Sequence, residues 1–444
     1  MPRKTTKKQF IRAPAIPQSG LSVPYEKTTL PTGLRIVTAT VPQSYGVSVN
    51  FLFGAGSRYE NDRLAGASHL FEHLLFKGTK KRPTPREIAE TVEAVGGIIN
   101  AFTDREITGY WCRIALPHYK RGIEVIVDMI RNSLFKDEDI EKEKQVVFEE
   151  IRSNRDSPPG RVSEMLDALI WPDQALGRDV AGTVESVKAI SRNEMLTYLH
   201  KQYIASNLVI SVAGNITHRE VVDQIGELLG DFKDGPAIPM FPFKDRLKGP
   251  IAQVEYRKTE QAHMALAFHG ISNTDPDRHA LNMLSVVLGE SMSSRLFEEV
   301  REKRSLAYDI HSGTGNYSDC GTFNVESGVD PKRAGDALPV IMNELSRIRE
   351  GVTDKEFDQA RELMKGRLLL RMEDSRAIAS SNGFQELLRG QIRSVDEMVA
   401  EIEAVDIEDI AAVAKRVITP KKLAFAMVGP FRNGIAKYER ALEM

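Results

Sequence analysis

An internal repeat constrains the fold of this 444-residue chain more than any other feature of its sequence. When the sequence is shifted so that position 50 falls on position 265, a shift of 215 residues, three separated segments align without gaps. The aligned pairs are 50–63 with 265–278, 189–195 with 404–410, and 207–216 with 422–431. One shift shared by segments so far apart indicates two tandem copies of a domain of about 200 residues.

Each copy shows the same order of secondary-structure signals. An apolar run rich in β-branched and aromatic residues, such as 47–57, is typical of a buried strand. Thr84, Pro85 and Glu87 form the N-cap, first position and capping box of a predicted helix. Helices and strands that do not strictly alternate favour an α+β fold. We therefore predict two tandem homologous domains, each a mostly antiparallel sheet with helices packed on one face.

Composition places the boundaries of these parts. Residues 1–24 form a basic N-terminal tail, which we expect to be flexible because prolines interrupt any amphipathic helix. The first copy occupies 25–232 and the second 250–444. The segment 233–249 is the predicted linker, because the stretch 231–250 contains four prolines.

The bulk properties argue against several classes of partner. A formal net charge of −2 offers no global field for nucleic acid or an anionic membrane surface. No run of about 18 apolar residues occurs, so we expect no membrane-spanning helix. Cys112 and Cys320 are the only cysteines, which favours a reducing compartment without a disulfide framework. We expect a bacterial cytoplasmic protein; the basic N-terminus leaves open a transit peptide and the mitochondrial matrix.

The segment 67–79 sets two histidines and a glutamate, His69, Glu72 and His73, among apolar residues. At the equivalent positions the second copy has two leucines and a valine. Aliphatic residues therefore satisfy the packing of this helix. The polar residues of the first copy serve another purpose.

The spacing of His69, Glu72 and His73 is that of a catalytic zinc helix. Residues three or four apart share one helix face, so two imidazoles and a carboxylate can point at one place. A catalytic zinc typically takes three protein ligands and a water, whose proton a nearby carboxylate can accept. The order His-x-x-Glu-His is the inverted zinc peptidase motif. The alternative is an amphipathic helix with partly exposed histidines.

A second predicted helix, over 137–158, is a candidate source of a third ligand. Its Glu143 and Glu150 are seven residues apart, or two turns, so both carboxylates share a face. The adjacent Glu149 points about 100° away from Glu150. Most other acidic residues of this helix are expected to be solvated.

These motifs resemble the pitrilysin/insulysin family of inverted-motif zinc peptidases. In size the chain is most similar to bacterial processing-peptidase homologues and to the mitochondrial processing peptidase β subunit. The matching stretches are GASHLFEHLLFKGT, GGIINAFTDRE, EKEKQVVFEEI and SSRLFEEVREKRSLAY. With the duplicated architecture, the resemblance covers nearly the whole chain. It implies a zinc metalloendopeptidase with one zinc ion per chain, a catalytic zinc-binding domain at 25–232 and a homologous non-metal domain at 250–444.

The resemblance assigns roles in the metal site. His69, His73 and Glu150 correspond to the zinc ligands. Glu72 corresponds to the general base, and Glu143 to a catalytic-site carboxylate that supports the ligands from outside.

The resemblance also implies substrate-binding residues. Asn100 and Ala101 match the strand along which the family aligns an extended peptide by β-augmentation. Arg301 and Tyr308 match the pair that completes the site from the other half. Their donors suit a peptide carbonyl or oxyanion. Without the resemblance, Asn100 reads as an ordinary polar strand or turn residue and Arg301 as part of a mixed-charge surface.

Family members close two halves into a chamber, and this chain supplies only two domains. The resemblance therefore predicts a homodimer that cleaves short or unfolded peptides, with no nucleic acid or membrane partner. Two alternatives stay open: a catalytically silent scaffold subunit, and an enzyme that requires an unlike partner chain. The intact metal motif argues against the first, and the Arg301/Tyr308 pair in the same chain argues against the second.

Overall fold

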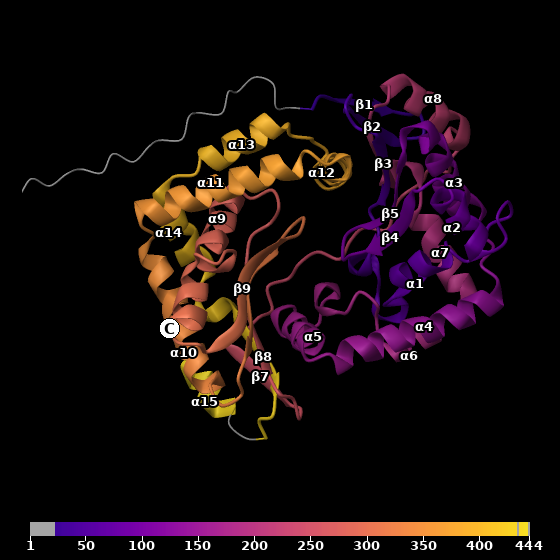
Figure 1. The fold of residues 1–444 in the computed structure, drawn as a ribbon. Helices are drawn as coiled ribbons and strands as arrows, with labels where there is room; N and C mark the ends of the chain where they lie inside the picture. The colour runs from indigo at the N-terminus through magenta and orange to yellow at the C-terminus, as the bar shows by residue number, and fades with distance from the viewer. Residues whose placement is uncertain (1–22, 433–434, 443–444) are drawn as a thin grey trace, which may run out of the picture.

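Two β-sheets, one from each copy of the repeat, organise the chain in the computed structural model, which describes residues 23–432 and 435–442 (Figure 1). The predicted N-terminal tail lies outside the described residues as far as residue 22. Within the described part, no helix combines the length and apolar character needed to cross a membrane.

The elements of the first half are β1 (Tyr25–Thr29), β2 (Arg35–Thr40), β3 (Gly46–Phe53), α1 (Ala67–Leu74), α2 (Pro85–Glu93), β4 (Ile98–Thr103), β5 (Thr108–Ala115), α3 (Tyr119–Asn132), α4 (Asp137–Asp156), α5 (Pro158–Ile170), α6 (Val184–Ala189), α7 (Arg192–Gln202), β6 (Leu208–Gly214) and α8 (His218–Leu229). Those of the second half are β7 (Ile251–Tyr256), β8 (Ala262–His269), α9 (Arg278–Gly289), a π-helix (Phe297–Glu302), β9 (Ala307–Asn316), β10 (Gly321–Val329), α10 (Ala334–Arg347), α11 (Asp354–Arg371), α12 (Ser375–Arg389), α13 (Val395–Glu403), α14 (Ile407–Val417), β11 (Leu423–Gly429) and α15 (Ile435–Ala441). The predicted capping box of α2 is present at Thr84 and Glu87.

Both sheets are mostly antiparallel, as predicted. The strand orders are β1-β2-β6-β3-β5-β4 and β7-β11-β8-β10-β9, and each sheet contains one parallel pair, β2 with β6 and β7 with β11. The repeat recurs element by element. Strands β6 and β11 begin at Leu208 and Leu423, and helices α7 and α14 begin at Arg192 and Ile407, 215 residues apart in both cases.

The two halves exchange one helix each. Helix α5 of the first half packs on β8 and β11, where Met165 and Leu166 share a core with Ala426. Helix α12 of the second half packs on β3 and β6, where Ile378 meets Ala213. The prediction placed helices on one face of each sheet. The exchanged helix covers the other face, because central strands such as β6 are apolar on both faces.

The exchange means that each half buries part of the other. The predicted boundaries 25–232 and 250–444 describe the two copies of the repeat in the sequence and remain a prediction. In the structure, a helix from each copy packs on the sheet of the other copy.

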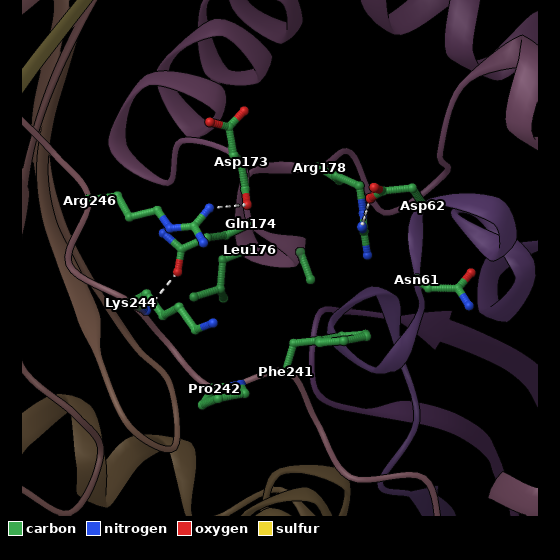
Figure 2. A pocket seen from close by; sticks show the side chains of 11 residues that line it. Asn61, Asp62, Asp173, Gln174, Leu176, Arg178, Phe241, Pro242, Lys244 and Arg246 are labelled. Carbon is green, nitrogen blue, oxygen red and sulfur yellow. Dashed lines mark hydrogen bonds and ion pairs between the residues drawn. The ribbon is translucent and has the colours of Figure 1, made fainter.

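The segment 231–250, which contains the predicted linker, has no helix or strand but is attached to both halves. The N–H of Phe243 donates to Oδ2 of Asp319 at 2.9 Å in the second half. On the first half, Nη1 of Arg246 donates to the carbonyl of Asp173 at 3.1 Å. Figure 2 shows the pocket of about 250 Å³ that this segment forms with the first half. The segment is therefore a connection that is hydrogen-bonded to both halves.

A buried charge cluster joins the β4–β5 hairpin of one half to the β9–β10 hairpin of the other. The side chain of Arg58 is fully buried, and its Nη1 and Nη2 lie 2.5 Å from carboxylate oxygens of Glu106 and Asp319 respectively. Ser318 donates from its N–H at 3.1 Å and from Oγ at 2.8 Å to Glu106. A buried guanidinium is stable only with such partners. We call Arg58, Glu106, Ser318 and Asp319 the inter-half joint.

Helix α12 packs so closely on the first sheet that adding one methyl group at Gly383 should change the stability of the protein. A Cβ added at Gly383 would lie 2.5 Å from Cδ1 of Leu52 and 3.1 Å from Cβ of Ser211. We expect Gly383→Ala to lower the free energy of unfolding by about 1 kcal/mol. Overpacking costs about 1–3 kcal/mol and exceeds the gain of about 1 kcal/mol in helix propensity.

Gly366 in α11 is the matched control, because nothing lies within 4 Å of a Cβ built there. Gly366→Ala should therefore raise the free energy of unfolding by about 1 kcal/mol. Urea unfolding followed by circular dichroism measures both variants. A Gly383→Ala protein stabilised as much as Gly366→Ala would refute the close packing of α12.

Candidate metal centre

A buried carboxylate fixes the N-terminus of α1. Oε2 of Glu60 accepts a hydrogen bond from the N–H of Gly66 at 2.9 Å, and Oε1 accepts one from the N–H of Ser68 at 2.6 Å. These bonds satisfy N–H groups that have no partner within the helix. Gly66 has a φ of 91°, and a Cβ there would lie 2.4 Å from the carbonyl oxygen of Ala181. Only glycine fits this helix start.

The apolar residues of α1 determine where its polar residues lie. They enter the core of the first half, which leaves His69, Glu72 and His73 among the neighbouring α4 and β4. In α4, Glu143 and Glu150 share a face, as the spacing predicts. The predicted site residues of both helices thus meet between α1 and α4.

Three ligand-type atoms converge there. Nε2 of His69 lies 3.7 Å and Nε2 of His73 lies 3.6 Å from Oε2 of Glu150. The ligand atoms of these three residues all lie within 4.8 Å of one another. The neighbouring Glu149 pairs instead with Arg152 at 2.5 Å and is 73% exposed, in accord with its predicted direction.

This donor set fits a zinc ion. Burial, with a smaller contribution from the neighbouring His73, lowers the pKa of His69 to about 4. The His69 imidazole is therefore neutral at neutral pH and has a lone pair to offer. Two imidazoles and one carboxylate also leave one tetrahedral position for water, as in catalytic zinc sites.

Glu143 supports the group from behind His73. Its Oε2 lies 3.2 Å from Nδ1 of His73, and its side chain is only 7% exposed. A hydrogen bond at Nδ1 fixes the tautomer and turns Nε2 toward Glu150. Nζ of Lys77 lies 2.5 Å from Oε1 of Glu143. Lys77 was not predicted, although its position four residues after His73 was a usable signal.

Glu72 lies beside the group and contacts the edge strand β4. Oγ1 of Thr103 donates to Oε2 of Glu72 at 2.6 Å. Burial raises the pKa of Glu72 above its usual range, against the opposing effects of the Thr103 hydrogen bond and of His73. Thr103 was not predicted, since no local pattern links residues 31 positions apart.

Asn100 and Ala101 lie in β4, the last strand of the first sheet. Their partners in β5 are Trp111 and Tyr110. The other edge of β4 pairs with no strand in the described sheet. Oδ1 of Asn100 accepts a hydrogen bond from the N–H of Ala101 at 2.8 Å.

Arg301 and Tyr308 lie in the second half, away from the metal group. The guanidinium of Arg301 lies 4.6 Å from the ring centroid of Phe297 and 5.6 Å from that of Tyr308. Tyr308, in β9, is 75% exposed. Within the described residues, no hydrogen bond or ion pair links this pair to His69, His73 or Glu150. One chain therefore does not bring all the predicted site residues together.

The second copy lacks the metal-site chemistry. In α9, the equivalent of α1, the residues are Leu284, Val287 and Leu288, and all three are buried in the core of the second half. Lys365 of α11 occupies the place of Glu150 and pairs with Glu362 at 2.7 Å. The prediction that aliphatic residues satisfy this helix position is confirmed.

Two family descriptions match the chain in tandem. Residues 35–184 match the insulinase family of peptidases, M16, and residues 189–364 match the inactive domain of peptidase M16. An uncharacterised zinc protease of Streptomyces coelicolor is 40% identical and covers 92% of this chain and 90% of its own length. One of Bacillus subtilis is 33% identical, over 92% of this chain and 99% of its own.

Solved structures share the fold. A protease from Helicobacter pylori matches with a TM-score of 0.87 at 23% identity, over 92% of this chain and 100% of that chain. Complex III2 from Candida albicans holds a chain that matches with a TM-score of 0.81 at 22% identity, over 94% and 100%. These two likenesses concern the fold alone. The two family matches and the identity to the zinc proteases confirm the resemblance seen in the motifs: the chain belongs to the insulinase family of peptidases, M16.

Proposed function

We propose that this chain is a zinc metalloendopeptidase that hydrolyses short or unfolded peptides. The observation that carries the proposal is the convergence of ligand atoms from His69, His73 and Glu150 within 4.8 Å, beside the carboxylate of Glu72. Relatives named as zinc proteases, at 33% and 40% identity, support it.

His69, His73 and Glu150 would hold one zinc ion, which when bound polarises a carbonyl and lowers the pKa of a bound water. Glu143 would keep the His73 ring turned toward the ion, and Lys77 would keep Glu143 in place.

Glu72 would act as the general base. Its Oε2 accepts the Thr103 hydrogen bond, so Oε1 is the oxygen left to accept the proton of the attacking water. The same carboxyl would then return that proton to the leaving amine nitrogen. Burial raises the pKa of Glu72, which makes its carboxylate a stronger base than one in water.

The substrate would add as a strand to β4 along Asn100 and Ala101. Among the described strands β4 pairs with β5 alone, so main-chain groups on its other edge are available to an extended peptide. Strand addition requires an extended segment with unpaired main-chain groups, which short or unfolded chains offer more readily than folded proteins.

Arg301 and Tyr308 enter the proposal through a homodimer. Tyr308 is exposed, and within the described part of one chain no hydrogen bond or ion pair links it to His69, His73 or Glu150. We propose that the Arg301/Tyr308 pair completes the site of a second subunit by stabilising the oxyanion. Light scattering of a fully active monomer would exclude this assembly. The bacterial relatives support a cytoplasmic location as part of the same proposal.

Mass spectrometry of products from a mixed peptide library tests the function directly. We expect cleavage by the purified chain, loss of cleavage with a chelator and recovery on adding zinc. A chain that binds no zinc and cleaves nothing would favour the scaffold role instead.

Glu72→Gln separates zinc binding from proton transfer. The variant should keep one zinc ion per chain and lose about 10²- to 10⁴-fold in kcat, the usual contribution of a general base. Zinc content by atomic spectroscopy and peptide cleavage measure the two effects. Residual activity within tenfold of the wild type would remove Glu72 from its proposed role.

Glu150→Gln and Glu149→Gln form a matched pair on adjacent positions of α4. Removing the ligand charge at Glu150 should weaken zinc binding by more than about 100-fold, the upper end of the loss seen for outer-shell partners. Within the described part of the chain, the exposed Glu149 pairs with Arg152 and not with the metal group, so its variant should bind zinc as the wild type does. Competition with a zinc-binding dye measures both affinities, and equal losses would refute the ligand assignment.

A further inference from the structure

Thr103 makes a short hydrogen bond to the proposed base. Its Oγ1 lies 2.6 Å from Oε2 of Glu72, a distance typical of a hydroxyl that donates to a charged carboxylate. Thr103 is the last residue of β4, the same strand that is proposed to receive the peptide. Base and substrate strand therefore share one structural element.

The chain that follows Thr103 is held from several sides. The tight turn is closed by the N–H of Asp104, which donates to the carbonyl of Ile107 at 2.8 Å. The N–H of Arg58 donates to the carbonyl of Arg105 at 2.9 Å. The next residue, Glu106, belongs to the inter-half joint. Thr103 is thus followed by a turn whose movement would break hydrogen bonds within the first half and the contacts of Glu106 with the second half.

The direction of the hydroxyl is also restricted. Thr103 is β-branched, so its χ1 angle has few accessible values and Oγ1 is held in a narrow range of positions. Glu72, in contrast, has three side-chain torsions, and within the described residues Thr103 is its only hydrogen-bond partner. Of the two partners, the Thr103 hydroxyl therefore has fewer accessible positions than the Glu72 carboxylate.

We propose that Thr103 is a positioning residue for Glu72. It holds Oε2, so that Oε1 is left to accept the proton of the water that attacks the carbonyl of a peptide lying along β4. This inference rests on the proposed function, because it assigns Thr103 a role in the same reaction. Thr103 touches neither metal nor peptide through its side chain and acts through Glu72.

Thr103→Val removes the hydroxyl but keeps the shape and β-branching. We expect kcat to fall by about tenfold or more, since a hydrogen bond to a charged group is lost. KM and zinc content should stay near the wild-type values, and the variant should remain folded at the assay temperature. Thr103→Ser restores the hydroxyl on a less restricted side chain, so it should recover kcat to within about threefold.

Thr40 provides the matched control. It is the last residue of β2, is half-buried like Thr103, and donates from Oγ1 to the carbonyl of Ile216 at 3.1 Å. Thr40→Val likewise loses a threonine hydroxyl and its hydrogen bond at the end of a strand, here to a neutral carbonyl outside the candidate site, and should leave kcat unchanged. Equal activity of Thr103→Val and wild type, or an equal fall in Thr40→Val, would overturn the positioning role.

Crystal structures of the zinc-loaded proteins give a readout that does not require activity. In the wild type and Thr103→Ser, the Glu72 carboxylate should occupy one position against residue 103. In Thr103→Val it should move or divide between rotamers. An unmoved carboxylate in Thr103→Val would overturn this inference alone. A wild type that cleaves no peptide, yet whose carboxylate moves on substitution, would overturn the proposed function while leaving the contact established.

Discussion

Arg58 is a fully buried cation that bonds one carboxylate from each half of the chain, and the relative placement of the halves depends on that contact. Removing one partner of a buried pair costs about 3–5 kcal/mol, because the other charge is then left without compensation. Glu106 and Asp319 lie at hairpin tips that occupy nearly equivalent places in the two copies. The halves therefore meet at related loops, around a charge that belongs to only one of them.

The joint has a consequence for the metal centre. Strand β4 ends at Thr103, three residues before Glu106, so the contact that joins the halves also anchors the strand that touches Glu72. The exchanged helices α5 and α12 oppose separation as well, since each would expose an apolar sheet face. A motion of one half against the other would have to preserve both the charge pairs and the exchanged helices. The joint thus holds the end of β4 from which Thr103 contacts Glu72.

Much of the fold and of the candidate site could be predicted from the sequence, because it depends on patterns of residues that are close together in the chain. The repeat predicted two copies, and the order of helix and strand signals predicted an α+β fold. The spacing of His69, Glu72 and His73 predicted a shared face on one helix, and that of Glu143 and Glu150 a shared face on another. The exchange of α5 and α12 was not predictable in this way, because an amphipathic helix shows that it has an apolar face but not which sheet receives it. Thr103 was missed for the same reason: a side-chain contact across 31 residues leaves no periodic signal.

Comparison of the two copies shows how much apolar burial the candidate metal site replaces. Where α9 packs Leu284, Val287 and Leu288 into a core, α1 carries two imidazoles and a carboxylate that cannot contribute the same apolar burial. The first half offsets this loss with polar contacts that the second lacks: Lys77 and Glu143 behind His73, and Thr103 beside Glu72. These contacts have directions, whereas aliphatic packing does not. These directed bonds fix the orientation of the α1 side chains, which is the property a metal centre requires.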